Sequence, residues 1–254
     1  MTSKKIKNAV KARYSQIAER GEQSCCSSCV CGINPLVQAE GIGYSREDLE
    51  CIPEEVLMGL GCGNPTAIVE LRLGETVLDL GSGAGVDAFL AASKVGPNGS
   101  VIGVDMTKEM IDKATDIAKR NGYTNIEFRL GEIEKLPVDD SSVDVVISNC
   151  VINLVPDKAK VFREAYRVLR TGGRLSISDI VADRALSDEM RNDLYAWAGC
   201  IAGALEQQQY LRVIKEAGFT DLQVSSSREF YVEDSNNNEM VKLSSITIRA
   251  YKIE

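Results

Sequence analysis

Val77-Leu-Asp-Leu-Gly-Ser-Gly-Ala-Gly85 is the stretch that decides the fold. A short apolar strand, 76–80, runs into Gly81, Gly83 and Gly85, and a helix is expected over 86–95. Glycines at such a turn let the backbone pass close to a ligand. A dinucleotide fingerprint would place Gly or Ala at position 86, where this chain has Val. The spacing therefore favours an amino-acid carboxylate over a pyrophosphate, although a turn needed only for packing also fits.

The pattern of strand and helix continues outward from this turn. Further strands are expected over 100–104, 125–130, 143–148 and 174–179, and helices over 108–121 and 157–170, with Thr107 as an N-cap. Apolar residues recur at helical spacing over 4–20, followed by a loop over 21–43. After residue 185 we expect helices at 187–199 and 206–217 and β structure at 220–227 and 243–252. This order predicts an α/β fold with a mostly parallel sheet and helices on both faces.

Polar residues stand where the predicted strands end. Asp105 follows the second strand, 20 residues after Gly85, and a carboxylate there can accept hydrogen bonds from both hydroxyls of a ribose. Met106 offers an apolar face to an adenine ring. After the third strand, the Ile133 N–H and the carboxylate of Glu132 or Glu134 could contact the adenine edge, and a solvated acidic loop is the alternative. Asn149 and Cys150 end the fourth strand and face the same crevice.

The composition argues against several classes of function. The 254 residues carry 29 basic and 37 acidic side chains, a net charge of −8, which disfavours nucleic-acid binding. The first residues are polar, and no apolar stretch approaches the length needed to span a bilayer, so a cytoplasmic protein with mostly reduced cysteines is expected. The absence of histidine excludes a histidine base, a Cys/His zinc site and a Ser–His or Cys–His nucleophile pair.

Eight cysteines remain as candidate chemical groups: Cys25, Cys26, Cys29, Cys31, Cys51, Cys62, Cys150 and Cys200. A lone cysteine is usually a small buried apolar residue. However, Cys62 precedes the first strand, Cys150 ends the fourth and Cys200 lies beyond the fifth. The three thiols could therefore converge at the crevice where the strands end. Three thiols without histidine suit a soft, thiophilic centre. A zinc knuckle at 25–31 is a rival, although no second C-x2-C pair follows.

The segments VLDLGSGAG, GVDM, GEIEKLP and SVDVVISN, in this order, resemble class I S-adenosylmethionine methyltransferases. The resemblance covers about residues 70–180 and implies a Rossmann-like, seven-stranded sheet with the cofactor over the carboxyl ends of the strands. It implies that Asp79 and Gly81, Gly83 and Gly85 hold the methionine end. It also implies that Asp105 binds the ribose and that Met106 and Ile133 bracket the adenine.

A closer resemblance covers nearly the whole chain. LGCGNP, SNCVINLVPDK, Gly199-Cys200 and a Cys-rich loop after YSQIAERG resemble arsenite methyltransferases. The resemblance implies that Cys62, Cys150 and Cys200 bind trivalent arsenic and that Cys25 or Cys26 is a fourth, redox-active thiol. Thioredoxin or glutathione would be the reductant, and a monomer is expected. The family often has an aromatic residue at the place of Leu60.

Three parts are expected on this reading: an N-terminal helix and Cys-rich cap over 1–60, a cofactor-binding core over 61–184, and a C-terminal part over 185–254 that walls the acceptor site and completes the sheet. Two other functions stay open. A C-methyltransferase of a quinone- or sterol-like acceptor fits the cofactor motifs equally, but gives no role to four thiols within seven residues. A thiol-based metal sensor without turnover is the other.

Overall fold

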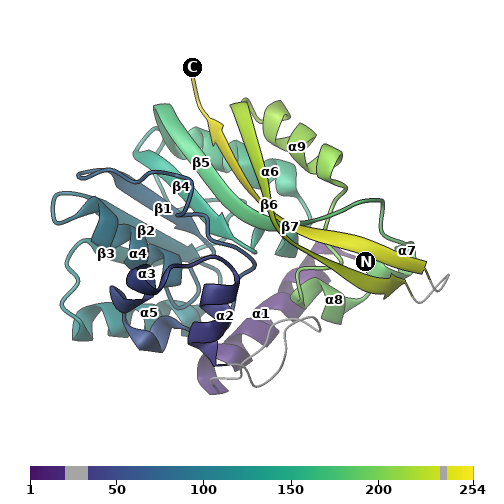
Figure 1. Ribbon diagram of the computed structural model, residues 1–254, viewed down its shortest axis with the longest axis horizontal. Coiled ribbons are helices and arrows are strands. Elements are labelled where there is room, and N and C mark those ends of the chain that lie inside the picture. The colour runs from purple at the N-terminus through teal and green to yellow at the C-terminus, as the bar shows by residue number, and fades with distance from the viewer. Residues whose placement is uncertain (21–33, 235–238, 254) are drawn as a thin grey trace.

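The computed structural model describes residues 1–20, 34–234 and 239–253, and over these residues the chain forms one seven-stranded sheet (Figure 1). The strand order is β3-β2-β1-β4-β5-β7-β6. Strands β1 to β5 pair in parallel, and β7 pairs antiparallel with both β5 and β6. The strands are β1 Thr76–Leu80, β2 Ser100–Asp105, β3 Ile126–Leu130, β4 Val143–Asn149, β5 Leu169–Ala182, β6 Thr220–Asp234 and β7 Glu239–Tyr251. The predicted seven-stranded, mostly parallel α/β fold is confirmed.

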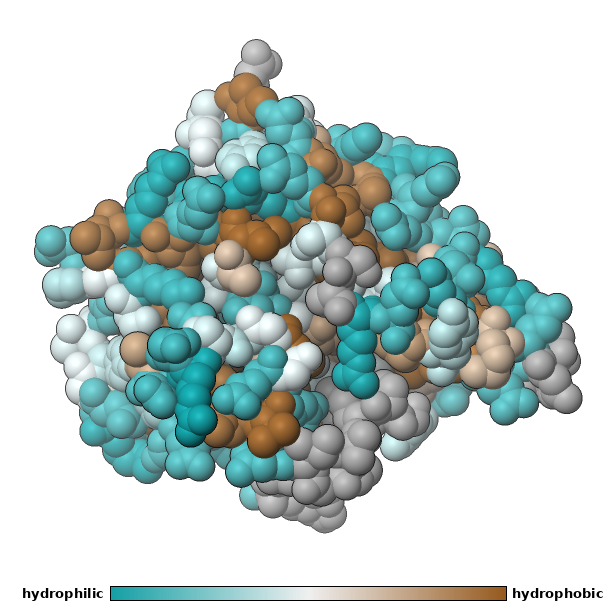
Figure 2. Space-filling model, in the orientation of Figure 1, coloured by the Kyte–Doolittle hydropathy of each residue, from teal (hydrophilic) through white to brown (hydrophobic). Residues whose placement is uncertain are grey.

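Helices cover both faces of the sheet because the buried strands are apolar on both sides. Leu78 and Leu80 of β1 pack with α6 (Lys158–Val168) and α9 (Gln207–Glu216). Val77, on the opposite face of β1, packs with α4 (Val86–Val95), which in turn packs with α5 (Lys108–Arg120). Hydrophilic residues cover most of the face shown in Figure 2, where hydrophobic residues reach the surface in separate patches.

The first helix, α1 (Ser3–Arg20), lies along α5 and α8 (Leu194–Ala198) (Figure 1). Its apolar stripe of Ile6, Val10 and Ile17 is buried, as the helical spacing predicted. This packing lays the helix across the carboxyl ends of the strands. The N-terminal segment is therefore part of the wall of the functional cleft.

Several elements differ from their predicted extents. Within the expected loop, α2 (Pro35–Gly41) forms because Asn34 caps it, accepting a hydrogen bond from the Leu36 N–H at 2.9 Å. Ser45 caps α3 (Arg46–Glu50) by accepting a hydrogen bond from the Asp48 N–H. The helix expected over 187–199 is divided into α7 (Asp188–Arg191) and α8, because Asp193 starts the second piece as its N-cap.

The C-terminal strands are longer than their apolar patterns suggested. Strand β5 starts at Leu169, before Gly172 and Gly173, and a register irregularity against β4 absorbs the extra residues. Strands β6 and β7 pair over almost their whole lengths. In the outer part of β6, Phe230 and Val232 pack against the core, and the opposite face is exposed and mostly polar.

Candidate active site

A cleft opens at the carboxyl ends of the strands, bounded by the loops after β1, β2, β3 and β4 and by α1. It contains about 1100 Å³ of empty space, including its open mouth. Lys7, Val10 and Tyr14 line it from α1, and Cys150 and Cys200 are also part of its lining. This is the edge at which open α/β sheets bind ligands.

The glycine turn after β1 forms the floor of the cleft. Gly81, Gly83 and Gly85 all have positive φ, at 66°, 52° and 102°. A Cβ on Gly81 would lie 2.4 Å from Val151, and one on Gly85 would lie 2.8 Å from Phe89, whereas one on Gly83 would meet nothing within 4 Å. Gly81 and Gly85 are therefore required for packing, while Gly83 leaves the floor open to a ligand.

Asp79, at the end of β1, carries an unsatisfied charge-bearing atom. The residue is 2% exposed, and its Oδ2 has no hydrogen-bond partner among the described residues. Burial, followed by the nearby charges of Asp87 and Asp105, raises the pKa of Asp79 well above its ordinary value. A buried carboxylate oxygen facing a cleft fits a cationic group such as the α-ammonium of S-adenosylmethionine. The residues present thus fit the methionine end of that cofactor.

Asp105 ends β2 and is held by the turn itself. Its Oδ2 accepts from the Gly83 N–H at 3.0 Å and its Oδ1 from the Thr107 N–H at 2.8 Å. Thr107 occupies the N-cap position of α5, but its side chain makes no capping hydrogen bond, so the predicted capping role is wrong. The carboxylate keeps further lone pairs for two ribose hydroxyls. Met106 lies beside it and lines the cleft.

The loop after β3 is tied to α1. Lys7 Nζ lies 2.7 Å from a carboxylate oxygen of both Glu132 and Glu134. Glu134 is buried and Ile133 is 6% exposed, so a fully solvated acidic loop is the wrong description. The pairing occupies one oxygen of each carboxylate. Contact of these residues and Ile133 with adenine stays a prediction.

Asn149 anchors the loop that carries Cys62. Its Oδ1 accepts from the Cys62 N–H at 3.1 Å, and its Nδ2 donates to the Gly63 carbonyl at 2.7 Å and the Tyr44 hydroxyl at 2.9 Å. Asp87 Oδ2 lies 3.2 Å from the same nitrogen. The amide thus positions a thiol, a role that the sequence did not indicate. Contact of Asn149 with the cofactor stays a prediction.

Cys150 is at the centre of the thiol group. It follows β4 with a positive φ of 58°, its N–H donates to the Ser178 carbonyl at 2.8 Å, and its thiol interacts with those of Cys62 and Cys200. Cys200 also has a positive φ of 61°, and its Sγ lies 3.0 Å from the Cys150 carbonyl. These left-handed conformations are unusual for cysteine and aim both side chains into a shared site. The three cysteines are therefore neighbours, as their placement predicted.

The arrangement of these thiols is not symmetrical. Cys150 and Cys200 are buried and line the cleft, whereas Cys62 is partly exposed and is not part of its lining. Contact with the Cys200 thiol lowers the pKa of Cys150, but contact with Cys62 and burial raise it, and the net value is well above the ordinary one. The Cys150 contact and burial raise the pKa of Cys200 in the same way. Both thiols are neutral at neutral pH.

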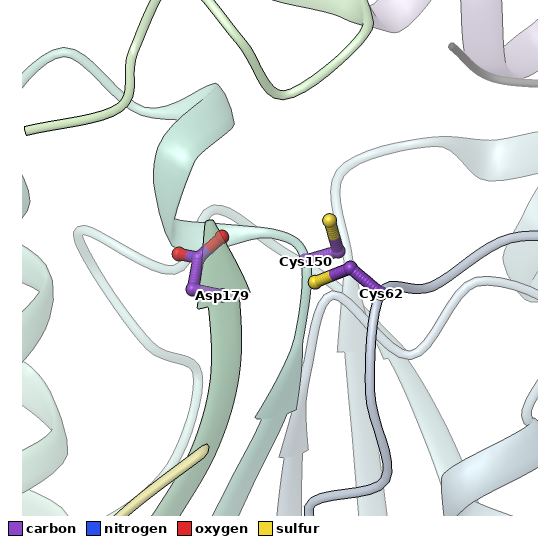
Figure 3. A group of neighbouring side chains, drawn as sticks. All are labelled: Cys62, Cys150 and Asp179. Carbon is purple, nitrogen blue, oxygen red and sulfur yellow. The ribbon is translucent and has the colours of Figure 1, made fainter. Parts of the chain in front are cut away.

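Asp179, on β5, is a site residue that the sequence analysis missed. A carboxylate oxygen of Asp179 and the Sγ atoms of Cys62 and Cys150 all lie within 4.8 Å of one another. In Figure 3 the Cys62 sulfur points toward Asp179, and Cys150 lies beside both. The predicted fifth strand ended at this residue, so its position at the carboxyl end of a strand was the available signal.

The other cysteines are not at this site. Cys51 is exposed at the end of α3. The predicted redox thiols Cys25 and Cys26, together with Cys29 and Cys31, lie outside the described residues. Among the described helices, none is long and apolar enough to cross a membrane.

Known methyltransferases resemble this chain over most of its length. Residues 71–218 match a family model described as a methyltransferase domain. The chain is 45% identical to an arsenite methyltransferase of Halobacterium salinarum, over 96% of this chain and 66% of that protein. It is 34% identical to the human arsenite methyltransferase, over 97% of this chain and 68% of that one. The chain thus spans about two thirds of the length of these relatives.

A solved structure gives the same result. The arsenic(III) S-adenosylmethionine methyltransferase from Chlamydomonas reinhardtii is 37% identical, with a TM-score of 0.68, over 87% of this chain and 74% of that one. A phosphoethanolamine N-methyltransferase of Haemonchus contortus with bound S-adenosyl-L-methionine is 18% identical, with a TM-score of 0.63, and shares the fold. On the extent of these matches, this chain has the class I S-adenosylmethionine methyltransferase fold and belongs to the arsenite methyltransferase family.

Proposed function

We propose that this chain transfers methyl groups from S-adenosylmethionine to trivalent arsenic, as arsenite or methylarsenite, held by the thiols of Cys62, Cys150 and Cys200. One observation carries the proposal. The cleft that contains the unpartnered Asp79 oxygen and Asp105 is also lined by Cys150, whose thiol interacts with two further thiols. Methylation of arsenic in this way would serve arsenic detoxification.

Neutral thiols suit the binding of arsenite. Each thiol forms an As–S bond while its proton leaves with an arsenic hydroxyl as water, so no net charge is buried and arsenic stays trivalent. The buried environment that raises the pKa of Cys150 and Cys200 therefore does not oppose binding. A centre with three sulfur ligands is pyramidal and keeps one lone pair.

For methyl transfer, that lone pair would have to face the cofactor. S-adenosylmethionine supplies an electrophilic methyl group on a sulfonium when it is bound. Asp79 and the Gly81–Gly85 turn would hold its methionine end, and Asp105 would hold the ribose. Arsenic has no proton to lose, so the reaction needs no general base, in keeping with a chain that lacks histidine. Proximity and orientation would supply much of the rate.

The N-terminal cysteines fit a reducing step. Methyl transfer leaves arsenic formally pentavalent, and two electrons are needed to return it to the trivalent state. Two thiols can supply these electrons by forming a disulfide, and thioredoxin or glutathione can reopen it by thiol–disulfide exchange. Cys25 or Cys26 would be one of the two thiols.

A direct experiment tests the proposal. Protein, S-adenosylmethionine with a labelled methyl group, arsenite and a thiol reductant are mixed, and the labelled arsenicals are separated. We expect labelled methylarsenicals and consumption of the cofactor. Binding of arsenite without cofactor consumption would indicate a sensor, and labelling of an added quinone in place of arsenic would indicate a C-methyltransferase.

A further inference from the structure

The strongest unassigned feature of the site is the buried carboxylate of Asp179. The residue is 1% exposed and lies near the carboxyl end of β5, beside the loop that holds Cys62 and the end of β4 that holds Cys150 (Figure 3). A carboxylate that is buried among thiols is costly unless it has hydrogen-bond donors or a ligand. Its partners therefore decide what it can do.

Three donors within the described residues hold this carboxylate. Oδ2 accepts from the Asn153 N–H at 3.1 Å and from the Tyr210 hydroxyl at 2.9 Å, and Oδ1 accepts from the Ile180 N–H at 3.0 Å. A carboxylate has about four lone-pair positions. One position on Oδ1 is left for a ligand.

The nearby charges favour the ionised carboxylate. Lys158 of α6 is buried, and its positive charge acts on Asp179 and opposes the effect of burial, which raises the pKa of Asp179 to about 6. Tyr210 of α9 and the Cys62, Cys150 and Cys200 thiols are the other titratable groups around it. The three donors that it already accepts from show that Asp179 faces the thiol group as a hydrogen-bond acceptor.

The geometry places an oxygen acceptor where a third sulfur was expected. Cys62, Cys150 and Asp179 lie mutually within 4.8 Å, while the Cys200 thiol lies against the Cys150 carbonyl. A trivalent arsenic bound first by Cys62 and Cys150 would keep one hydroxyl group. The Asp179 carboxylate, which lies within 4.8 Å of both sulfurs, can accept the hydrogen of that hydroxyl.

We propose that Asp179 accepts a hydrogen bond from the last hydroxyl of an arsenite held by Cys62 and Cys150, before Cys200 replaces that hydroxyl. Two thiols first displace two hydroxyls, each releasing one water. The Cys200 thiol then forms the third As–S bond, and its proton leaves with the last hydroxyl as water. Arsenic remains trivalent throughout. The proposal rests on the proposed function and adds the residue that orders ligand exchange.

Asp179 would therefore distinguish between substrates. Arsenite keeps a hydroxyl after two thiols have bound, whereas methylarsenite loses both of its hydroxyls to two thiols and keeps none. Asp179 thus contributes to the capture of arsenite and not to that of methylarsenite. A residue that only supported the fold would affect both substrates equally.

The first test compares the two substrates in Asp179→Asn, with saturating cofactor and reductant. Loss of a hydrogen bond to a charged group is expected to raise the KM for arsenite roughly tenfold. The KM for methylarsenite is expected to stay within about twofold on the same reasoning. Asp144→Asn, a half-buried carboxylate on β4 that bonds the Thr76 N–H away from the thiols, is the matched control. Equal losses with both substrates, or no loss with either, would overturn the proposal.

A second test does not depend on replacing Asp179. Arsenite is added to Cys200→Ser, and the arsenic ligands are counted by X-ray absorption spectroscopy. We expect two sulfur ligands and one oxygen ligand, because two thiols leave one hydroxyl on arsenic, and we expect weaker binding of arsenite when Asp179→Asn is added to this variant. Failure of this variant to bind arsenite would reject the order of exchange. If the wild type does not methylate arsenite, the proposed function itself is wrong. That result can be distinguished from a failure of the Asp179 proposal, which shows only in the Asp179→Asn and Cys200→Ser variants.

Discussion

The two ends of the cleft differ in the charge of the side chains that form them. At the cofactor end, the buried Asp87 and the half-buried Asp105 lie so close to the buried Asp79 that their charges disfavour its ionisation, and one oxygen of Asp79 lacks a partner among the described residues. At the acceptor end, the thiols of Cys62, Cys150 and Cys200 are in contact through Cys150, and burial and these contacts raise the pKa of Cys150 and Cys200 well above the ordinary value. The cofactor end therefore suits a cation, and the acceptor end suits a neutral, thiophilic centre.

This difference in charge explains how the chain can bind its two ligands at separate places. A cationic cofactor gains little from thiols, and a neutral arsenical gains little from the carboxylates that gather at the cofactor end. The single carboxylate within the thiol group, Asp179, accepts from three protein donors and keeps one position for the hydroxyl of arsenite. We expect variants at one end to affect one ligand only, and four predictions test that separation.

The largest effect is expected at Cys150. Cys150→Ser should reduce methylation of arsenite at least about a hundredfold, because two remaining thiols cannot fix the arsenic lone pair in line with the methyl group. The affinity for the cofactor, measured by calorimetry, should change little. Cys51→Ser, at an exposed cysteine away from the cleft, is the control and should behave as the wild type. A large loss of cofactor affinity in Cys150→Ser would break the separation of the two ends.

A smaller loss is expected at Asp105. Asp105→Ala should weaken binding of the cofactor about tenfold to a hundredfold, the range for a lost hydrogen bond to a charged group. Binding of methylarsenite, followed through the fluorescence of Trp197 near Cys200, should be unchanged. Asp116→Ala, at an exposed carboxylate on α5, controls for the loss of one charge. Unchanged cofactor affinity in folded Asp105→Ala would contradict the ribose assignment.

The parallel part of the fold could be predicted from sequence because its signals are local. The strand before Gly81, the helix from Val86 and the order of the four following strands were all found by apolar runs and turn residues. The strands β6 and β7 were predicted too short because their outer halves are polar and solvated on one face. No local pattern distinguishes such an antiparallel extension from a loop.

The site residues also differ in whether a local signal in the sequence could predict them. Cys150 could be placed because a strand ends there, and Cys62 and Cys200 because of a resemblance. Asp179 also ends a predicted strand, but its role depends on donors from distant segments, including Tyr210. The link between Lys7 and Glu132 spans 125 residues and could not be read from any local spacing. Pairings of this kind are set by how helices pack, which the sequence pattern does not specify.

The third prediction concerns the buried charge at the acceptor end. Burial lowers the pKa of Lys158 to about 8, below its ordinary 10.5, while Asp179 and Cys200 act in the opposite direction. Between these two values the unfolded chain binds more protons than the folded one, so the free energy of unfolding gains a contribution that rises with pH. The difference in stability between wild type and Lys158→Met should therefore shift in favour of the wild type by roughly 1–2 kcal/mol from pH 7 to pH 9.5.

Denaturant unfolding at the two pH values measures this shift, and comparison with Lys158→Met cancels the titration of all other groups. Lys160→Met, at an exposed lysine on the same helix, should show no such shift. The same shift in both variants would mean that Lys158 is not held in a low-polarity environment. The acceptor end would then be more polar than its neutral thiols suggest.

The smallest effect is expected at Lys7, which connects α1 to the loop after β3. Its ammonium lies 2.7 Å from carboxylate oxygens of both Glu132 and Glu134, and the Lys7 side chain is 25% exposed, so solvent screens the pair only in part. A paired charge of this kind contributes up to about 1 kcal/mol, which corresponds to at most about fivefold in affinity. Because α1 and this loop line the same cleft, Lys7→Met should weaken cofactor binding by that amount at low salt, while methylarsenite binding should be unchanged.

Raising the salt concentration should weaken cofactor binding by the wild type toward the level of the variant. Added ions screen the ion pair of the wild type, and the variant has no such pair. Lys5→Met, at an exposed lysine on the same helix, removes the same charge and should leave both the affinity and its salt dependence as in the wild type. Equal effects of the two lysine variants would show that net charge, and not the contact of α1 with Glu132 and Glu134, sets the affinity of the cofactor end.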